Sequence, residues 1–446
     1  MPVARTELEY ENGAWRQYIS LPDANGKFNR QDALTTEIAN RYTMNVVGRQ
    51  NGTGKYFVIT DKFSDKASVY LYDAAANTFS DTAVLAHPEF DISNLIFSRR
   101  AEDFGDLIGF TYDGPVSTAY WLDPEMKGIQ DGLNAAFPGK NVSLTDYTAD
   151  RNRVLFQVSA PNSPPAYYVL VNKSKVAVIG SQRPWIDEDS LGKGDFVYYT
   201  ARDGMKIPAI ITYPAGYKEG DKAKGAIIVP HGGPWSRDSA GFDSSGWTQF
   251  FASRGYIIMQ PQYRGSAGWG RELWLAGDGE WGQKMQDDKD DGAAWLVSQG
   301  YVDADKIAMH GYSYGGFAAI AASVRPNSPY QCAIAGAGVG NLAKLANEWG
   351  DNRIQRIVQG DTVKGMDPQQ NTDKVNIPIL IYHGDYDVRV PIFHSREFYN
   401  AIKDRQPDSE FIVYKQMGHQ GNKWLPEHKG DILDQIDRFL TTKCNM

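Results

Sequence analysis

The hydrophobic positions of the chain follow two different patterns before and after residue 190. The first part is rich in short segments in which apolar and polar residues alternate between turn residues, and it has few long helical periods. Such alternation is typical of half-buried β-strands. The second part places continuous apolar runs, such as 226–230, 306–309 and 379–382, between longer helix-prone stretches. That order predicts a mostly parallel sheet with helices on its faces.

The first part also repeats itself. One segment, Ala-Ser-Val-Tyr-Leu-Tyr-Asp, has two clear copies and one fainter copy, and the last residues of the four are 50, 50 and 49 positions apart. The four segments are 16–23, 67–73, 117–123 and 166–172. The later three each follow another strand-like segment, at 56–59, 107–110 and 154–157. A period of about 40–50 residues with several strands per unit predicts β-propeller blades rather than a plain β-sandwich.

One pentapeptide in the second part indicates a type of catalytic residue. Residues 311–315 read Gly-Tyr-Ser-Tyr-Gly and stand between an apolar run at 306–309 and a helix-prone run at 317–324. In the pattern Gly-x-Ser-x-Gly, a strand turns sharply into a helix and leaves the serine at the tip of the turn. The chain has 44 glycines, so the pentapeptide alone is weak evidence. The strand before it and the helix after it favour Ser313 as the nucleophile of a serine hydrolase.

A serine nucleophile needs a base that takes its proton, and in α/β-hydrolases the histidine follows the serine in the chain. Four histidines follow Ser313. His419 lies in a glycine-bounded loop directly after the strand-like segment 411–414, so we expect it to be the base. The other three have positions more typical of structural side chains: His383, His394 and His428.

The carboxylate that orients the base is expected between the serine and the histidine. The buried strand-like segment 379–382 breaks at Gly384 into a loop that contains Asp385 and Asp387. Loops at the carboxyl ends of parallel strands are where α/β sheets place their chemistry. The pattern therefore leaves two candidate acids, Asp385 and Asp387.

An oxyanion needs two hydrogen-bond donors aimed at the point where charge develops. One is normally the main-chain N–H after the nucleophile, here Tyr314, and the other comes from the loop after an earlier strand. The apolar run 226–230 is such a strand, and 231–235, His-Gly-Gly-Pro-Trp, is the loop after it. An ordinary Gly-Pro turn could have the same sequence. The position of this loop after an apolar run and before Ser313 favours a role in the oxyanion hole.

Several segments of the second part occur in an order that points to one family. They are His231-Gly-Gly-Pro, Gln262-Tyr-Arg-Gly-Ser-Ala-Gly-Trp-Gly270, Trp281-Gly, Gly311-Tyr-Ser-Tyr-Gly-Gly316, His383-Gly-Asp-Tyr-Asp-Val-Arg-Val-Pro391 and Gly418-His419. Together they resemble the catalytic domain of the prolyl oligopeptidase family, and His-Gly-Gly-Pro is similar to its acylaminoacyl-peptidase-like branch. The resemblance covers about residues 190–446. It implies an α/β-hydrolase fold, a doubly wound and mostly parallel sheet.

The resemblance also implies roles for individual residues. In this family the acid is the third residue after the glycine of His-Gly-x-x-Asp, which selects Asp387 over Asp385. In this branch the second oxyanion donor is a main-chain N–H of the Gly-Gly pair, which would be that of Gly233. The implied chemistry is acyl transfer through Ser313, Asp387 and His419, and it needs neither a metal nor another cofactor.

The implied activity is that of a serine peptidase acting on short or N-acylated peptides. A carboxylesterase that uses the same triad on acyl or aryl esters is an alternative, and so is an inactive propeller-based binding protein. Aromatic side chains beside the motifs are candidates for an acyl pocket, and family peptidases hold a substrate carbonyl with an arginine. The candidate substrate-binding residues are Trp235, Tyr312, Arg353 and Arg356, for which core packing or surface ion pairs are the competing explanation.

The resemblance reaches the first part of the chain as well, because this family carries an N-terminal propeller. We expect a partial propeller over 1–190 and the hydrolase domain over 191–446. A family propeller usually has about seven or eight blades, whereas 1–190 has room for about three and part of another. An open propeller exposes strand edges that pair readily with another chain. We therefore expect a homo-oligomer formed through this edge.

Composition limits which binding partners and which cellular compartment we expect. The formal net charge of −8 disfavours nucleic acid and anionic membranes as partners. The first residues lack the apolar core of a signal peptide and no run is long enough to span a membrane, so we expect a cytoplasmic protein. It would be periplasmic or secreted if the start has been trimmed. With only two cysteines, Cys332 and Cys444, we expect free thiols rather than a disulfide scaffold.

Overall fold

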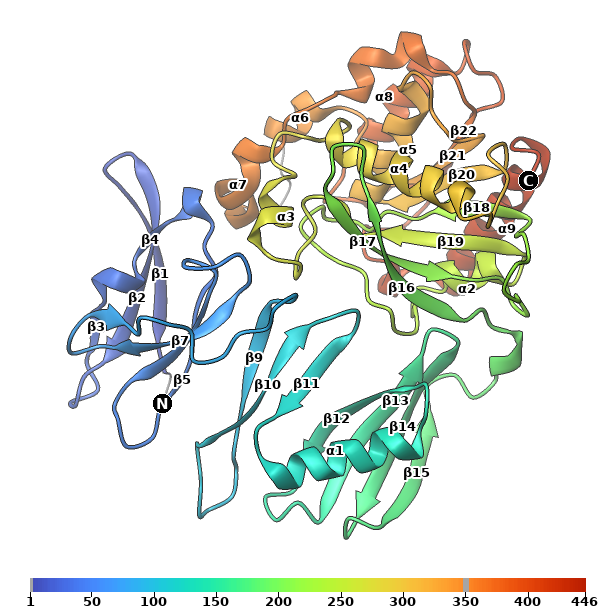
Figure 1. Ribbon diagram of the computed structural model, residues 1–446. Coiled ribbons are helices and arrows are strands. Elements are labelled where there is room, and N and C mark those ends of the chain that lie inside the picture. Colours follow the sequence, from blue (N-terminus) through green and yellow to red (C-terminus); the bar gives the residue numbers. More distant parts are fainter. Residues whose placement is uncertain (1–2, 348–352) are drawn as a thin grey trace. The chain divides into compact units, whose positions relative to one another are not determined.

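The chain forms two compact units. The computed structural model describes residues 3–347 and 353–446. Unit 1 comprises Met1–Ala160, Pro165–Pro184 and Gly268–Glu272. Unit 2 comprises Pro161–Pro164, Trp185–Ala267 and Leu273–Met446. Figure 1 shows small sheets in the first unit and a large sheet with helices in the second.

Unit 1 is built from four small β-sheets. The first contains β1 (Arg5–Glu11), β2 (Ala14–Pro22), β3 (Phe28–Arg30) and β4 (Thr36–Glu37). The second contains β5 (Met44–Arg49), β6 (Tyr56–Thr60), β7 (Ser68–Asp73) and β8 (Thr78–Phe79). The third contains β9 (Ile92–Phe97), β10 (Leu107–Asp113) and β11 (Ser117–Trp121). The fourth contains β12 (Asn141–Tyr147), β13 (Arg153–Ala160), β14 (Ser163–Val171) and β15 (Lys175–Ser181).

The repeated segments of the sequence correspond to equivalent strands of these sheets. The four copies fall on β2, β7, β11 and β14, and the strand-like segments before the later three are β6, β10 and β13. Strand β13 shows the alternation that predicted it, since Val154, Phe156 and Val158 are buried and the residues between them are half-buried. The predicted fold class, a partial β-propeller followed by an α/β-hydrolase, is confirmed by this architecture.

Unit 1 is not entirely β, because it contains helix α1 (Pro124–Ala136), which the repeat pattern did not predict. The Asp123 carboxylate caps the helix by accepting a hydrogen bond from the N–H of Met126 at 2.9 Å. Met126, Ile129 and Leu133 form its buried face and share a core cluster with strand β13. Their spacing of three and four residues is typical of an amphipathic helix. The helix follows β11, where the other complete sheets have a fourth strand.

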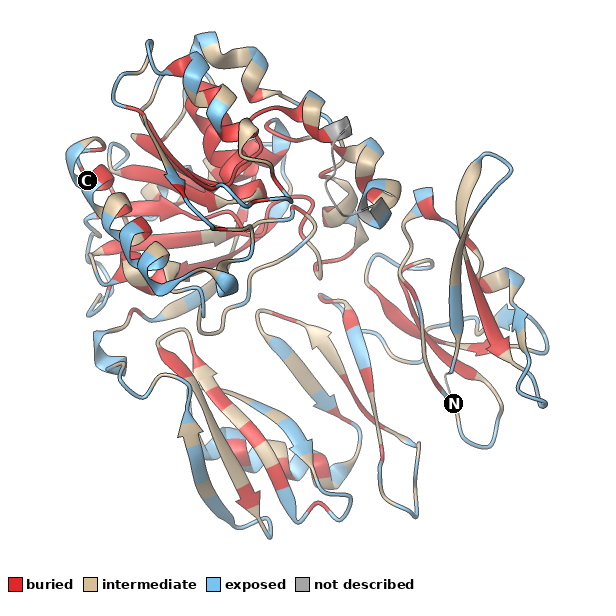
Figure 2. Ribbon diagram, turned by 180° about the vertical axis from the view of Figure 1, so that it is seen from behind, coloured by how far each residue is buried: buried red, intermediate tan, exposed pale blue. Residues whose placement is uncertain are grey.

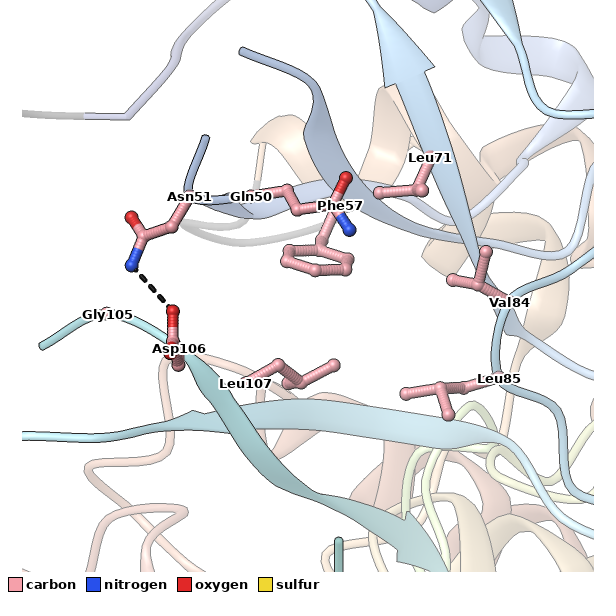
Figure 3. A pocket seen from close by; sticks show the side chains of 9 residues that line it. All are labelled: Gln50, Asn51, Phe57, Leu71, Val84, Leu85, Gly105, Asp106 and Leu107. Carbon is pink, nitrogen blue, oxygen red and sulfur yellow. Dashed lines mark hydrogen bonds between the residues drawn. The ribbon is translucent and has the colours of Figure 1, made fainter. Parts of the chain in front are cut away.

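A pocket of about 450 Å³ opens between the second and third sheets of unit 1 (Figure 3). Its apolar wall includes Phe57 of β6, Leu71 of β7 and Leu107 of β10. At its polar end the Asn51 side-chain amide donates a hydrogen bond to the Asp106 carboxylate at 2.8 Å. None of the site residues predicted from the sequence lines this pocket.

Strand β15 is an edge strand of the fourth sheet. Its Val178 and Ile179 side chains are 72% and 60% exposed. Exposed apolar residues on an edge strand favour pairing with another chain. The homo-oligomer expected from the sequence stays a prediction.

Unit 2 contains one eight-stranded sheet with the order β16-β17-β19-β18-β20-β21-β22-β23. β16 pairs with β17, and β17 with β19, in antiparallel fashion, and the remaining pairs are parallel. The strands are β16 (Gly194–Thr200), β17 (Lys206–Thr212), β18 (Gly225–Ile228), β19 (Tyr256–Pro261), β20 (Ile307–Tyr312), β21 (Cys332–Gly336), β22 (Ile379–Gly384) and β23 (Glu410–Tyr414). Figure 2 shows that the central strands are almost entirely buried. Their continuous apolar runs reflect helices covering both faces of the sheet.

The helices after β18 are α2 (Trp247–Ala252), α3 (Arg271–Leu275), α4 (Lys284–Ser298), α5 (Tyr314–Val324), α6 (Leu342–Asn347), α7 (Arg353–Gln359), α8 (Phe393–Ile402) and α9 (Pro426–Thr442). Helix α9 is an example of how the helices pack on the sheet. Its side chains Ile432, Ile436 and Phe439 lie in one core cluster with Ile227 and Ile334 of the sheet. Within the described part of the chain, no helix has both the length and the apolar character needed to cross a bilayer.

The expectation of free thiols is wrong, because Cys332 and Cys444 form a disulfide. Cys332 is the first residue of β21, and Cys444 lies just after α9. Packing of α9 on the sheet brings the two Cα atoms to 5.5 Å, although 112 residues separate them in sequence. The pairing is therefore a product of tertiary packing, which the spacing of the two cysteines does not reveal.

We expect Cys444→Ser to lower the free energy of unfolding by about 2–4 kcal/mol, because the cross-link restricts the unfolded chain over a long loop. Urea denaturation of the oxidised protein measures this loss. Wild-type protein treated with a reductant is the matched control and should lose the same amount, whereas the variant should not respond to the reductant. Alkylation of both cysteines in unfolded but unreduced wild-type protein would contradict the disulfide.

Candidate active site

The candidate nucleophile lies at a strained turn between β20 and α5. Ser313 has φ 61° and ψ −117°, a conformation that side-chain-bearing residues rarely adopt. It stands at the N-terminal cap of α5, and its own N–H donates to the Gly336 carbonyl of β21 at 2.9 Å. This geometry is that of the sharp strand-to-helix turn predicted from the pentapeptide.

The glycines around Ser313 are required by crowding. A Cβ atom on Gly311 would lie 2.3 Å from the main chain of Gly315, and one on Gly315 would lie 2.3 Å from the Pro230 carbonyl oxygen. A Cβ on Gly316 would lie 2.4 Å from the carbonyl oxygen of Gly336. The turn thus packs directly against the backbone of its neighbouring strands, which leaves no room for side chains.

The candidate base reaches the serine from the loop after β23. His419 Nε2 lies 2.9 Å from Ser313 Oγ, although the two residues are 106 positions apart in sequence. The imidazole also packs beside the Tyr312 ring, with 5.1 Å between the centroids. Its loop is held by Trp424, whose indole N–H donates to the Gly418 carbonyl at 2.8 Å. The side chain of His419 is only 11% exposed, so its orientation is fixed by packing.

Of the two candidate acids, only Asp387 contacts the base. Its carboxylate accepts a hydrogen bond from His419 Nδ1 at 2.6 Å. The other oxygen accepts from the main-chain N–H groups of Arg389 and Val390 at 3.0 and 2.9 Å. Asp385 is exposed, and its carboxylate instead accepts from the N–H of Gln416 at 2.6 Å. The geometry therefore joins Asp387, and not Asp385, to the imidazole.

The electrostatics of this pair favour an ionised acid. Burial of the Asp387 carboxylate would by itself raise its pKa, but hydrogen bonds from His383 and His419 outweigh burial and hold the pKa well below its ordinary range. An ionised carboxylate that accepts from Nδ1–H keeps the imidazole proton on that nitrogen. The lone pair of His419 Nε2 is then directed at the Ser313 hydroxyl.

The three other histidines that follow Ser313 make their contacts with other groups than the Ser313 hydroxyl. His383 Nε2 donates to the Val390 carbonyl at 2.8 Å, and its Nδ1 lies 2.7 Å from the Ser395 hydroxyl. His394 is buried, and burial lowers its pKa to about 3. The ring of His428 lies 5.8 Å from that of Tyr414 on the strand before the loop. No hydrogen bond within the described residues links any of the three to Ser313.

One proposed oxyanion donor follows Ser313 in the chain, and the other lies in a loop that lines the same cavity. Tyr314 is the first residue of α5, and the first N–H groups of a helix have no partner within the helix. Gly233 adopts φ +126° in the loop after β18 and lines the same cavity as Ser313. The neighbouring Gly232 approaches so closely that a Cβ atom on it would lie 3.5 Å from Ser313 Cβ. At Gly232 the loop therefore brings its main chain close to the serine.

The cavity at Ser313 has a volume of about 530 Å³ and a polar wall. Charged side chains of both signs line it, and they are Arg237, Asp238, Asp243 and Arg389. Burial, reinforced by the negative charge of Asp243, raises the pKa of Asp238 to about 7. Burial thus weakens the negative charge of Asp238 near neutral pH.

The candidate substrate-binding residues from the sequence lie in different places. Tyr312 lines the cavity. Trp235 is not among the lining residues and packs near Trp281, with 6.2 Å between the ring centroids. Arg356 is exposed on α7 and does not line the cavity. Arg353 begins α7, and its side chain lies outside the described residues.

Arg389 and Asp238 are among the lining residues that were not singled out from the sequence. Arg389 follows Asp387 by two positions, so its place in the acid loop was an available signal. Its side chain is exposed, and no hydrogen bond from its guanidinium is found within the described residues. Asp238 gave no signal, because it lies in an irregular stretch between β18 and α2 without a motif.

Comparisons with known proteins find similarity to peptidases. The model of the prolyl oligopeptidase family matches residues 242–446. Dipeptidyl aminopeptidase BIII of Pseudoxanthomonas mexicana is 27% identical over 430 residues, which cover 92% of this chain and 59% of that protein. The chain therefore spans less than two thirds of the length of this relative.

Solved structures show the same fold. A puromycin hydrolase superposes with a TM-score of 0.72 at 18% identity, covering 98% of this chain and 67% of that one. An acylaminoacyl peptidase of Pyrococcus horikoshii superposes with a TM-score of 0.68 at 17% identity, covering 98% and 68%. At these identities the likeness concerns the fold.

We expect Asp387→Asn to lower kcat by about 10⁴, because an amide cannot hold the imidazole in the orientation and tautomer that the serine needs. Asp385→Asn is the matched control from the same loop and should stay within a few-fold of wild type. Steady-state kinetics on an activated ester measures both. Equal losses in the two variants would contradict the assignment of the acid.

We expect kcat/KM to fall on acidification with the slope of a single proton. Because Asp387 keeps its pKa below the ordinary range, it stays ionised and adds no second proton to the loss of activity. A pH–rate profile between about pH 4 and 8 measures this slope. A flat profile, or a fall with the slope of two protons, would contradict this assignment of protons.

Proposed function

We propose that the chain is a serine hydrolase of the prolyl oligopeptidase family and that it cleaves short or N-acylated peptides through Ser313, His419 and Asp387. One observation carries the proposal. An unbroken chain of hydrogen bonds runs from the Asp387 carboxylate through the His419 imidazole to Ser313 Oγ. The match to peptidases of this family supports acyl transfer to water as its use.

In the proposed mechanism Ser313 Oγ attacks the carbonyl carbon of the scissile bond while His419 Nε2 takes the hydroxyl proton. The ionised Asp387 stabilises the imidazolium that forms. The oxyanion accepts hydrogen bonds from the N–H groups of Tyr314 and Gly233, and the N-terminus of α5 adds a favourable field. His419 then gives its proton to the leaving amine, and a water molecule releases the acyl group by the reverse sequence.

The charges around the cavity support a blocked amino terminus on the substrate. Burial raises the pKa of Asp238 to about 7, so its negative charge is incomplete at neutral pH. Arg237 and Arg389 then favour a carbonyl oxygen, which accepts hydrogen bonds, over a free ammonium group. An acetyl or formyl cap offers such an oxygen without a positive charge. The related proteins are named for both kinds of substrate, a dipeptidyl aminopeptidase and an acylaminoacyl peptidase.

We expect acetyl-amino-acid anilides to be cleaved with a kcat/KM at least about tenfold above that of the same anilides with a free amino group, a difference of about 1.4 kcal/mol. Aryl acetates tested beside them report the esterase alternative. Ser313→Ala should abolish all of these activities and labelling by a fluorophosphonate while leaving the thermal unfolding unchanged.

Two outcomes would contradict the proposal. Turnover of esters alone would favour the carboxylesterase. Absence of both turnover and fluorophosphonate labelling in the wild-type protein would favour an inactive binding protein.

A further inference from the structure

Lys289 of helix α4 carries a charge that is fully buried. Its side chain has no exposed surface. The ammonium donates a hydrogen bond to the Met285 carbonyl at 2.5 Å, one turn earlier in the helix. Within the described part of the chain it forms no ion pair with a carboxylate. A buried charge without a counter-ion lowers the stability of the fold, so packing alone would favour an apolar side chain at this position.

The carboxylates nearest to Lys289 in the sequence are engaged with other groups. The Asp288 carboxylate accepts hydrogen bonds from the Arg264 guanidinium, in the loop after β19, at 2.9 and 2.7 Å. Asp290 lies 3.8 Å from the guanidinium of Arg325, which follows α5. Each of these carboxylates therefore has an arginine beside it, and the Lys289 ammonium is left without a carboxylate of its own.

The ammonium instead lies over the faces of two aromatic rings. It is 3.6 Å from the centroid of the Tyr263 ring and 5.2 Å from that of the Tyr314 ring. At both distances a cation is attracted to the face of the ring. The two rings also stack on each other, with 5.3 Å between their centroids. Lys289 and the two tyrosines thus form one buried cluster.

Both tyrosines are connected to the groups that we propose to bind the oxyanion. Tyr314 follows Ser313 and carries one of the two donor N–H groups. The Tyr263 hydroxyl donates a hydrogen bond at 2.7 Å to the main-chain carbonyl of His231, in the loop that carries Gly233. Burial lowers the pKa of His231 to about 3, so its ring adds no charge of its own near neutral pH. A charge that holds the two tyrosine rings therefore acts on both donor loops.

The charge of Lys289 changes with pH near neutrality. Burial is the main cause that lowers its pKa to about 7. The carboxylates of Asp288 and Asp290 act against this shift, and the guanidinium groups of Arg325 and Arg264 act with it. The positive charge is therefore lost as the pH rises above about 7. A neutral amine lacks the attraction that a cation has for the face of an aromatic ring.

We propose that Lys289 is a positioning residue of the active site, whose ammonium binds the faces of Tyr263 and Tyr314 and thereby holds the two oxyanion donors in place. The inference deepens the proposed function and rests on it. Because the oxyanion exists only after Ser313 has attacked, less firmly held donors should slow turnover more than they weaken substrate binding. The same buried charge then lowers stability and raises activity.

Lys289→Met tests this role, because it removes the charge and keeps an unbranched side chain. We expect kcat at about pH 6 to fall about tenfold with KM nearly unchanged, a smaller loss than the usual 10²–10³ for a missing oxyanion donor. The melting temperature at this pH should rise, because the variant no longer buries an ammonium. Lys284→Met, at an exposed position of the same helix, is the matched control and should change neither quantity.

The pH dependence of the rate is a measurement that a purely structural side chain would not change. The ratio of the wild-type kcat to that of Lys289→Met cancels every titration that the two proteins share. This ratio should be about tenfold below about pH 6 and approach one above about pH 8, where wild-type Lys289 has lost its proton. The wild-type profile shows the same loss by itself, even if the variant does not fold.

The pH dependence of stability has a defined sign. The pKa of Lys289 in the folded protein is lower than the value of about 10.4 in an unfolded chain. The unfolded chain therefore binds the proton more tightly, and wild-type stability rises between about pH 7 and 10 relative to that of Lys289→Met. The difference between their melting temperatures should be largest below about pH 7 and narrow above it.

The possible outcomes separate this inference from the proposed function. Wild-type kcat in folded Lys289→Met, with turnover still abolished by Ser313→Ala, overturns the inference alone. A ratio of rates that stays constant with pH, together with a lower melting temperature of the variant, indicates a packing role and also overturns it. Wild-type turnover that survives Ser313→Ala overturns the proposed function and this inference with it.

Discussion

The arrangement of the site depends on backbone crowding around Ser313. Three glycines allow the turn between β20 and α5 to touch the Pro230 carbonyl on one side and the Gly336 carbonyl on the other. These contacts hold Ser313 at a positive φ. The residue would adopt a more favourable conformation if the surrounding backbone moved away. The central strands are buried on both faces and cannot shift independently. The strain at one residue is thus maintained by the packing of the whole sheet.

The polar groups reach the serine because parallel strands end at the same edge of the sheet. Ser313, Asp387 and His419 follow β20, β22 and β23, and the loop with Gly233 follows β18. Each loop is held in place by its own contacts, and most of these contacts involve main-chain groups. Two N–H groups hold the Asp387 carboxylate, and an indole holds the carbonyl of Gly418. These side chains are therefore held in place by rigid elements.

Local patterns in the sequence predicted the parts of the structure that local chemistry determines. The turn at Ser313, the propeller strands and the strand before His419 each have a signature within a few residues. The choice of Asp387 over Asp385 needed the family resemblance, because the two carboxylates differ only in their tertiary contacts. Helix α1 had a capping Asp123 and apolar residues at helical spacing, but the repeat of β-strands around it favoured another interpretation. The disulfide had no sequence signal, since it joins residues that only the packing of α9 brings together.

The disulfide changes the covalent topology of the catalytic half of the chain. It closes a ring between Cys332 and Cys444 that includes the loops of both Asp387 and His419. A single cut of the main chain anywhere within that ring leaves the two pieces covalently joined, and their strands stay paired in the sheet. Asp387 and His419 are therefore retained together after such a cut, which makes the exposed loops of this segment the places where the oxidised protein tolerates a nick.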